Sequence, residues 1–154
     1  MHSYKHFIDL MQRSDTAVKL GIDNTIPKEL DFNLRLLFQH YMSLADSFPK
    51  GKSIYITSGY RCPRLNKAVG GVPNSNHTKC CAFDFAFNFV SSKLEFLETF
   101  DRLKCYYLSY YQREFDDDYR AALQRFNHHF IVYPDRLFVH YQIITGFMED
   151  NPIW

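Results

Sequence analysis

The sequence is short of the features that would place it in a specialised structural class. None of its apolar runs approaches the ~18 residues that a membrane-spanning helix needs, so no membrane insertion is expected. Its 18 basic and 17 acidic residues almost cancel, which leaves a formal net charge of +1. This balance gives no reason to expect nucleic acid or an anionic membrane surface as a partner. The sequence also has no internal repeat and no low-complexity linker.

Cysteine is scarce, and its spacing argues against a disulfide framework. The four cysteines are Cys62, Cys80, Cys81 and Cys105, and none of them belongs to a Cys-x-x-Cys pair. Adjacent cysteines such as Cys80 and Cys81 are poorly placed for a disulfide with each other. A reducing compartment is therefore the better match to this cysteine usage.

The N-terminal segment MHSYKHFIDLMQRSD does not have the pattern of a signal peptide. Charged residues interrupt its apolar positions, and it has no small-residue cleavage site. We therefore expect synthesis as a soluble protein of the cytoplasm.

The residues that are present predict a globular protein. Hydrophobic residues make up 46% of the chain and aromatic residues 18%, which is too apolar for intrinsic disorder. A chain of 154 residues can bury a usable core, so one domain over residues 1–154 is expected.

Hydrophobic periodicity predicts an α+β fold, in which N-terminal helices pack on a small antiparallel sheet. Residues 91–103 are expected to form a helix with Leu94, Leu97 and Phe100 facing inward, whereas the Tyr-rich stretch 105–111 is ambiguous. Residues 134–136 separate two apolar runs and predict a hairpin. Further helices are expected at 4–12, 16–20, 28–47, 63–69 and 114–125, and strands at 53–57, 81–87, 130–133 and 137–144.

The clearest sign of chemistry lies in the segment 75–84. A loop histidine, His77, precedes a predicted strand in which Asp84 shares a face with two alanines. A carboxylate buried on a strand is costly unless it is paired or bound to metal, and zinc accepts imidazole nitrogen and carboxylate oxygen. His140, on a later strand, is a candidate third ligand. The spacing alone leaves open a surface-loop His77, a salt-bridged Asp84 and a core His140.

Several short motifs follow one another along the chain. They are Arg13-Ser14-x-Thr16-Ala17, Gly21-Ile-Asp-Asn24, Ile56-Thr-Ser-Gly-Tyr-Arg61, Leu65-Asn66, Gly70-Gly71, Ser75-x-His77, Ala82-x-Asp84 and Phe138-Val-His140. Together they resemble the zinc D-Ala-D-Ala carboxypeptidase and L-alanyl-D-glutamate endopeptidase family, most of all its short phage-like members. The resemblance covers roughly residues 7–89 and 126–144. It implies a hedgehog/D-Ala-D-Ala peptidase-like fold with Zn2+ held by His77, Asp84 and His140.

The resemblance also implies roles for residues outside the ligand set. Arg61 matches an arginine that holds a substrate carbonyl or carboxylate near the metal, a task that suits a planar and permanently charged guanidinium. Ser75 matches a small polar residue that hydrogen-bonds substrate beside the first ligand. Without the resemblance, Arg61 reads equally as a surface salt-bridging residue and Ser75 as a turn residue. Tyr60 and Asn66 are expected to support the loop rather than to touch substrate.

The sequence departs from the family pattern at Cys80. The family usually has glycine at this position, directly before Cys81. A side chain there would crowd the loop or offer a thiolate to the metal. We expect a small buried residue rather than a ligand.

A second departure concerns the general base, a carboxylate that family members carry shortly before the last histidine. The corresponding positions are Leu137 or, in some phage-like members, Val132 or Tyr133, and none of them is acidic here. The nearest acid is Asp135 in the predicted hairpin turn, which is either the base or a solvated turn residue. The histidine pair at 128–129 offers alternative bases, whereas Tyr133 can donate a hydrogen bond but is a poor base at neutral pH.

The resemblance implies hydrolysis of peptidoglycan stem peptides, as a carboxypeptidase or an endopeptidase, by a phage or prophage protein that acts on the bacterial cell wall. The missing acid leaves open a catalytically impaired module that binds zinc or peptidoglycan. A virion component is a third reading, in which tyrosines at 106–107 and 110–111 form an interface, although a core position suits them better. The protein is expected to be a monomer.

Overall fold

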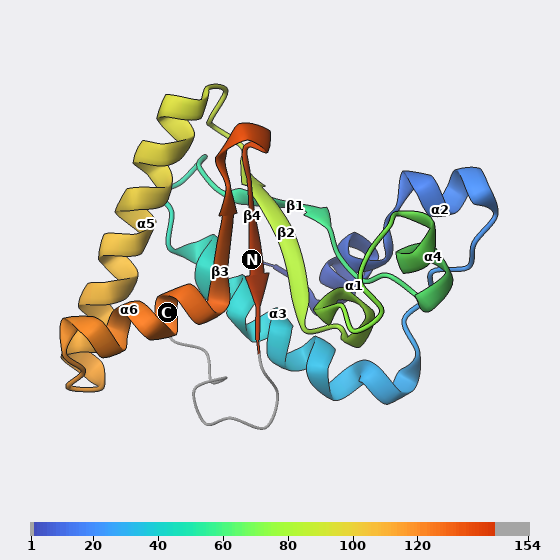
Figure 1. Cartoon of the computed structure of the whole chain (residues 1–154), viewed down its shortest axis with the longest axis horizontal. Helices are drawn as coiled ribbons and strands as arrows, with labels where there is room; N and C mark the ends of the chain where they lie inside the picture. Colours follow the sequence, from blue (N-terminus) through green and yellow to red (C-terminus); the bar gives the residue numbers. More distant parts are fainter. Residues whose placement is uncertain (1, 144–154) are drawn as a thin grey trace.

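A computed structural model of the chain describes residues 2–143 and has the α+β fold that the sequence predicts (Figure 1). Residue 144 of the last predicted strand lies outside this range. The strands are β1 (Ile54–Ser58), β2 (Ala82–Phe87), β3 (Phe130–Tyr133) and β4 (Phe138–Gln142). The α-helices are α1 (Tyr4–Gln12), α2 (Asp15–Leu20), α3 (Asp31–Asp46), α4 (Pro63–Ala68), α5 (Lys93–Glu114) and α6 (Tyr119–His129). Short 3-10 turns are η1 (Lys28–Leu30), η2 (Asn76–Lys79) and η3 (Pro134–Arg136).

The four strands form one antiparallel sheet with the order β1-β2-β4-β3. β2 and β4 therefore lie side by side at its centre, although α5, α6 and β3 separate them in the sequence. Their register places Asp84 directly opposite His140. Because directly opposed residues of antiparallel strands point to the same face, the pairing brings these two side chains together.

The two faces of β2 have different surroundings. Its phenylalanines face the hydrophobic core, where the ring of Phe83 lies 5.9 Å from that of Tyr41 on α3. The ring of Phe87 lies 5.5 Å from that of Phe96 on α5. Figure 1 shows α3 passing behind the strands and α5 running alongside the sheet. The opposite face of β2 carries Asp84 between two alanines, so small side chains leave space around the carboxylate.

The N-terminal helices begin and end where their capping residues predict. The Ser14 hydroxyl accepts a hydrogen bond from the Ala17 N–H and so caps α2, and Gly21 ends that helix at φ 64°. In α3, residues at three- and four-residue steps are buried on one face, namely Leu34, Leu37, Tyr41 and Leu44.

The C-terminal helices differ from the prediction. α5 continues to Glu114 and includes the Tyr-rich stretch that the sequence left ambiguous. The expected inward positions of Leu94 and Leu97 are wrong, because these side chains are 67% and 40% exposed. A straight helix turns the same face to the core along its whole length. In α5 this face carries the large aromatic residues Tyr107 and Tyr111 of the second half, and their burial turns Leu94 and Leu97 towards solvent. The buried residues of α5 are Phe96, Leu103, Tyr107, Leu108 and Tyr111.

The second C-terminal helix is also shifted. α6 begins at Tyr119 rather than at 114, because Asp118 accepts a hydrogen bond from the Ala121 N–H and caps it there.

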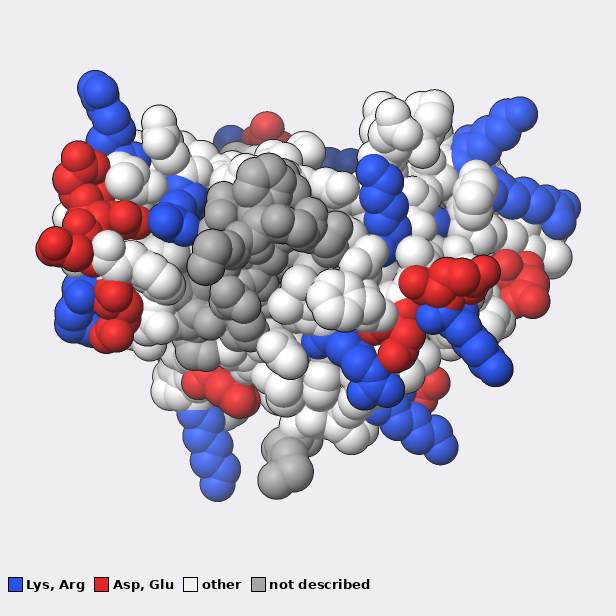
Figure 2. All heavy atoms as spheres, turned by 90° about the horizontal axis from the view of Figure 1, so that it is seen from below, with Lys and Arg blue, Asp and Glu red and all other residues white. Residues whose placement is uncertain are grey.

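The described surface carries mixed charge. On the face shown in Figure 2, acidic and basic side chains intermingle at both ends, and neither sign forms a continuous patch over the residues described. Within residues 2–143, no helix is both long and apolar enough to span a membrane.

Candidate metal centre

Three side chains that are far apart in the sequence meet on the open face of the sheet. His77 comes from η2, Asp84 from β2 and His140 from β4. One ligand atom of each lies within 4.8 Å of the other two, and the two imidazole centroids are 5.1 Å apart. The structure thus brings the three predicted ligands together. Two imidazole nitrogens and one carboxylate oxygen form a donor set that suits zinc and leaves a further position for water or substrate.

A close backbone approach at Gly59 holds His77 in place. The buried imidazole places Nδ1 2.7 Å from the Gly59 carbonyl oxygen. A Cβ at Gly59 would lie 2.5 Å from the carbonyl oxygen of Met11 in α1. The next residue, Tyr60, donates its N–H to that same Met11 oxygen at 2.7 Å. Glycine is therefore required where the loop after β1 crosses α1, and this crossing sets the carbonyl that orients His77.

The hydrogen bonds of His77 assign its proton. A carbonyl oxygen only accepts, so Nδ1 donates to Gly59 and Nε2 carries the lone pair of the neutral ring. Nε2 lies 3.3 Å from Oδ1 of Asp84. A metal-ligating histidine is usually held in this way, with the other nitrogen donating to a carbonyl or carboxylate.

The contacts of His140 show that its proton is on Nε2, whereas that of His77 is on Nδ1. Its Nε2 lies 3.0 Å from Oε1 of Gln142, and its Nδ1 lies 2.8 Å from Oδ1 of Asp84. The amide of Gln142 is oriented by two other bonds, since Oε1 accepts from Asn76 and Nε2 donates to the carbonyl of His128. Oε1 is therefore an acceptor, His140 donates to it from Nε2, and Nδ1 is left to face Asp84.

The three converging atoms are thus all acceptors when both histidines are neutral. Lone pairs on His77 Nε2 and His140 Nδ1 face the same carboxylate oxygen of Asp84 and repel it. A proton on each ring or one bound cation removes this repulsion. The residues present therefore fit a divalent metal ion, and the outer hydrogen bonds already hold both rings in the orientation that it needs.

Asp84 stays ionised throughout the neutral range. Burial by itself raises its pKa, but hydrogen bonds donated by the protonated rings of His140 and His77 and the charge of these rings outweigh burial and lower the pKa to about 2. In the metal-free site the carboxylate therefore pairs with the proton on each ring, and a bound cation takes the place of those protons.

Arg61 reaches the same carboxylate from the loop after β1. Its Nη2 lies 3.9 Å from Oδ2 of Asp84, and its side chain is 19% exposed. Its Nη1 donates to Oδ1 of Asn66 at 3.3 Å, and Asn66 donates in turn to the carbonyl of Val72 at 2.8 Å. A Cβ at Gly71 would overlap the Asn66 amide, so the glycine loop makes room for this support. Arg61 is accordingly a positioned residue of the cluster rather than a solvated surface arginine.

Ser75 joins the cluster through the backbone of the first ligand. Its Oγ accepts a hydrogen bond from the His77 N–H at 3.3 Å and caps η2. The side chain also lines the cavity described next. The turn-closing role is thus present in the structure, and the hydroxyl proton is left to serve a ligand.

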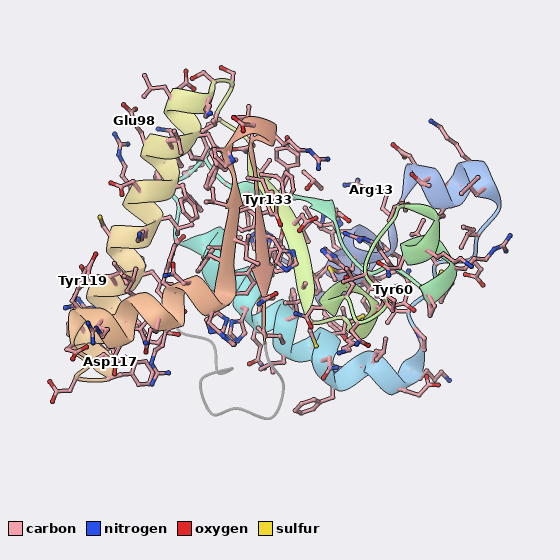
Figure 3. All side chains as sticks on the ribbon, viewed as in Figure 1. Arg13, Tyr60, Glu98, Asp117, Tyr119 and Tyr133 are labelled. Carbon is pink, nitrogen blue, oxygen red and sulfur yellow. The ribbon has the colours of Figure 1, made fainter. Side chains whose placement is uncertain are left out.

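A cavity of about 750 Å³, which we call the main cavity, opens over the cluster. One wall contains Arg13 and Tyr60, and the other contains Tyr133 of the β3–β4 hairpin (Figure 3). Other residues lining it that bear on the chemistry are Asp15, Arg61, Ser75, His77, Asp84, Arg136 and His140. Sequence reasoning missed Asp15 and Arg136 as lining residues, because they lie at a helix start and in a turn, where no periodicity marks the facing direction.

The structure does not bring Asp135 to this cavity. Its Oδ1 lies 2.5 Å from Nζ of Lys93 at the start of α5, and its side chain is 83% exposed. Asp135 is absent from the residues that line the main cavity, and so are the alternative bases His128 and His129. In this conformation the predicted base is a solvated turn residue.

The two hairpin positions at which the resemblance implies a glutamate, Val132 and Tyr133, face different directions. Val132 is paired with the buried Val139 and packs against the core. Tyr133 is paired with Phe138, on which its ring is stacked at 4.6 Å, and it lines the main cavity. Only the second of these two positions therefore faces the cluster.

Cys80 is part of the core and not of the metal cluster. It is fully buried and follows η2 with a left-handed backbone, at φ 56°. That conformation favours glycine, which explains why a glycine suits this position. Burial raises the pKa of the Cys80 thiol to about 12, so it is neutral at physiological pH and a poor metal ligand.

Comparison with known proteins adds one match. A family model described as Peptidase M15 matches residues 5–114, a span that contains His77 and Asp84 but ends before His140. No curated protein and no solved structure matches the chain. The assignment of His140 to the cluster therefore comes from the strand pairing with β2 rather than from the family match.

Metal binding tests the ligand set directly. We expect about one zinc ion per chain, and we expect Asp84→Asn or His140→Ala to weaken zinc binding by more than about 100-fold, beyond the effect of outer residues. Elemental analysis and competition with a chelator measure this. Asp135→Asn is the matched control, because it removes an exposed carboxylate that does not face the cluster. Unchanged zinc binding by Asp84→Asn would contradict the ligand set.

The low pKa of Asp84 predicts how the metal-free protein responds to acid. The folded pKa of about 2 lies below the ordinary value of 3.8 for an aspartate, so the unfolded chain takes up a proton at higher pH than the folded chain. The stabilisation is present near pH 5 and is lost as the pH falls towards 2, a change of roughly 2–3 kcal/mol in the free energy of unfolding. Urea denaturation between pH 2 and 6 measures it. Asp84→Asn should flatten this part of the curve, and a curve of unchanged slope would refute the assignment.

Proposed function

The chain belongs to the peptidase M15 family, and from this premise we propose that it is a zinc-dependent peptidase that cleaves the stem peptides of bacterial peptidoglycan. The observation that carries the proposal is the convergence of His77, Asp84 and His140 on one point at the floor of the main cavity. The substrate class is supported by the resemblance of the motifs around Arg61 and Ser75 to cell-wall carboxypeptidases and endopeptidases.

The same resemblance supports the wider setting. We propose one peptidase domain over residues 1–154, encoded by a phage or prophage, which acts as a monomer on the cell wall. A carboxypeptidase and an endopeptidase both fit the site, because the main cavity is open along the sheet face.

In this proposal His77, Asp84 and His140 hold the ion. Zinc bound there supplies Lewis acidity, which polarises a carbonyl group and lowers the pKa of water. Gly59 and Gln142 keep each imidazole in the tautomer that presents a lone pair to the ion. The ligand side chains do not have to reorient when the ion binds, because these hydrogen bonds already fix their orientation.

Arg61 and Ser75 act on the peptide itself. Arg61 donates hydrogen bonds to the carbonyl oxygen of the scissile bond, where negative charge develops during hydrolysis. Asn66 steadies the guanidinium at 3.3 Å, so the donors are aimed before the peptide arrives. Ser75 keeps its oxygen on the His77 N–H and turns its hydroxyl proton to the peptide backbone.

The scarcity of carboxylates around the metal cluster favours a second candidate function. Among the described residues that line the main cavity, Asp15 is the one carboxylate besides Asp84, and it lies at the start of α2 on the wall away from the hairpin. A site without a close base retains metal and peptide but loses the 10²–10⁴-fold that proton transfer contributes. A module that binds peptidoglycan peptides without efficient turnover is therefore the alternative.

Digestion of purified peptidoglycan tests the proposed activity. The zinc-loaded protein is expected to release new amino termini or free D-alanine, and chelation should abolish this. Arg61→Lys should lower kcat/KM by about 100-fold or more with zinc content unchanged, because the fork of donors is lost. Arg64→Lys on α4 is the control, since Arg64 is exposed and does not line the main cavity. An unmodified protein that binds zinc and cuts nothing would favour the binding module.

The hairpin acid is tested separately by Asp135→Asn. From its pairing with Lys93, we expect the rate of hydrolysis to stay within about twofold of the unmodified protein, as for other exposed residues away from a site. A loss of about 100-fold or more at unchanged zinc content would show that the carboxylate serves as the base after all. The readout is kcat on a soluble stem peptide.

A further inference from the structure

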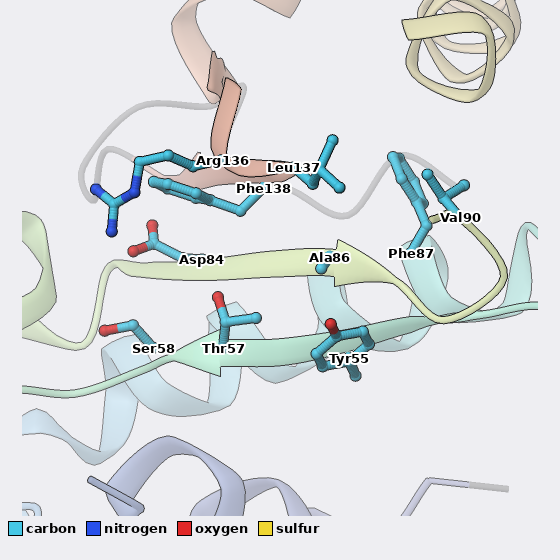
Figure 4. A pocket seen from close by; sticks show the side chains of 10 residues that line it. All are labelled: Tyr55, Thr57, Ser58, Asp84, Ala86, Phe87, Val90, Arg136, Leu137 and Phe138. Carbon is cyan, nitrogen blue, oxygen red and sulfur yellow. The ribbon is translucent and has the colours of Figure 1, made fainter. Parts of the chain in front are cut away.

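The β3–β4 hairpin presents a cation to the main cavity. Arg136, the last residue of η3, lines the main cavity. It also lines a second cavity of about 440 Å³, which we call the side cavity. Figure 4 shows the guanidinium of Arg136 directed towards the same end of the side cavity as the Asp84 carboxylate. Arg136 therefore stands at the junction of the two cavities, beside the candidate metal centre.

Neighbouring contacts hold Arg136 in this direction. Asp135 is drawn to the other side of the hairpin by Lys93, which leaves the cavity side of the turn to Arg136. The guanidinium carbon lies 5.1 Å above the ring of Phe138, which is itself stacked on Tyr133. Stacking on an aromatic face positions a guanidinium without using its N–H donors.

Within the part of the chain that the structure describes, the guanidinium of Arg136 has no acidic partner of its own. Among residues 2–143, no ion pair involves Arg136, whereas Arg61 at the opposite wall lies 3.9 Å from Asp84. Two arginines thus flank one buried carboxylate that the histidines already share. The excess of positive charge in this part of the cleft favours an anionic ligand.

We infer that Arg136 binds a carboxylate of the substrate, and that the protein selects peptides with a free carboxylate next to the bond positioned at Asp84. The inference rests on the proposed function and adds a substrate feature to it. A guanidinium pairs with a carboxylate through two parallel N–H donors, which gives orientation as well as affinity.

The side cavity describes the residue that carries this carboxylate. The side cavity has a polar end and an apolar end (Figure 4). Thr57, Ser58 and Asp84 line the end near Arg136, whereas Tyr55, Ala86, Phe87, Val90 and Leu137 line the other end. An aliphatic side chain fits the apolar end while Arg136 holds the carboxylate at the polar end. The carboxylate belongs either to the C-terminal residue of the peptide or to an acidic side chain within it.

The inference is tested by removing the charge of the peptide carboxylates and, separately, the charge of Arg136. The probes are a synthetic peptidoglycan stem pentapeptide with all carboxylates free, one with its C-terminal carboxylate as carboxamide, and one with its side-chain carboxylates as carboxamides. The protein variants are Arg136→Gln and, as a matched control, Arg120→Gln, an exposed arginine on α6 that lines neither cavity. Binding is measured by calorimetry with chelator-treated protein, and hydrolysis with zinc-loaded protein.

One carboxamide probe is expected to bind the unmodified protein and Arg120→Gln about 10- to 100-fold more weakly than the free peptide, as for a charge-assisted hydrogen bond. For Arg136→Gln the free peptide and that carboxamide should bind alike. The probe that shows the loss identifies the source of the carboxylate. Zinc content should be the same in all three proteins.

The inference is overturned if Arg136→Gln weakens all three probes equally, or if neither carboxamide differs from the free peptide. Its failure is separable from failure of the proposed function. If the protein hydrolyses all three probes alike, it is a peptidase but Arg136 does not recognise a carboxylate. If the protein binds the free peptide more tightly than one carboxamide but hydrolyses neither, Arg136 recognises a carboxylate but the protein is not a peptidase.

Discussion

The structure depends on one electrostatic constraint, the meeting of two imidazole nitrogens, from His77 and His140, with Oδ1 of Asp84. The carboxylate is buried on the central strand pair, and both imidazoles point their free nitrogens at the same oxygen. Such an arrangement is stable only with positive charge between the groups, and a bound divalent ion supplies it more completely than two protons. The hydrogen bonds that the two imidazoles donate to the Gly59 carbonyl and the Gln142 amide oxygen hold their other nitrogens in this unfavourable contact.

The rest of the cleft is arranged around this constraint. The glycine loop and Asn66 aim Arg61 from one wall, and the hairpin brings Arg136 and Tyr133 from the other. The main cavity is lined by three arginines, Arg13, Arg61 and Arg136, and by two carboxylates, Asp15 and Asp84. Because Asp84 belongs to the metal cluster, this charge distribution suits recognition of an anionic peptide better than abstraction of a proton.

The sequence predicted the local elements well where caps and periodicity agree. Helix α2 is bounded by Ser14 and Gly21, and β2 alternates as its aromatic and small residues predict. The prediction failed for Leu94 and Leu97 because the inward face of α5 is decided by aromatic residues ten or more positions further on. It was also silent on Arg136, since a turn residue has no periodic neighbour that fixes its direction. For Asp135, proximity in sequence to His140 suggested proximity to the metal, but Lys93 of a distant helix draws the side chain away.

The sequence by itself determined which residue types are available to the site. The residue types, the α+β class and the order of the motifs follow from local chemistry, because caps, turns and the alternation of a strand need no distant partner. What only the tertiary structure decided is which side chains share one point in space. The register of β2 on β4 placed Asp84 opposite His140, and the crossing of Gly59 over α1 turned His77 towards them. Contacts of this kind join segments that are far apart along the chain, and no local pattern records the direction in which such segments finally face.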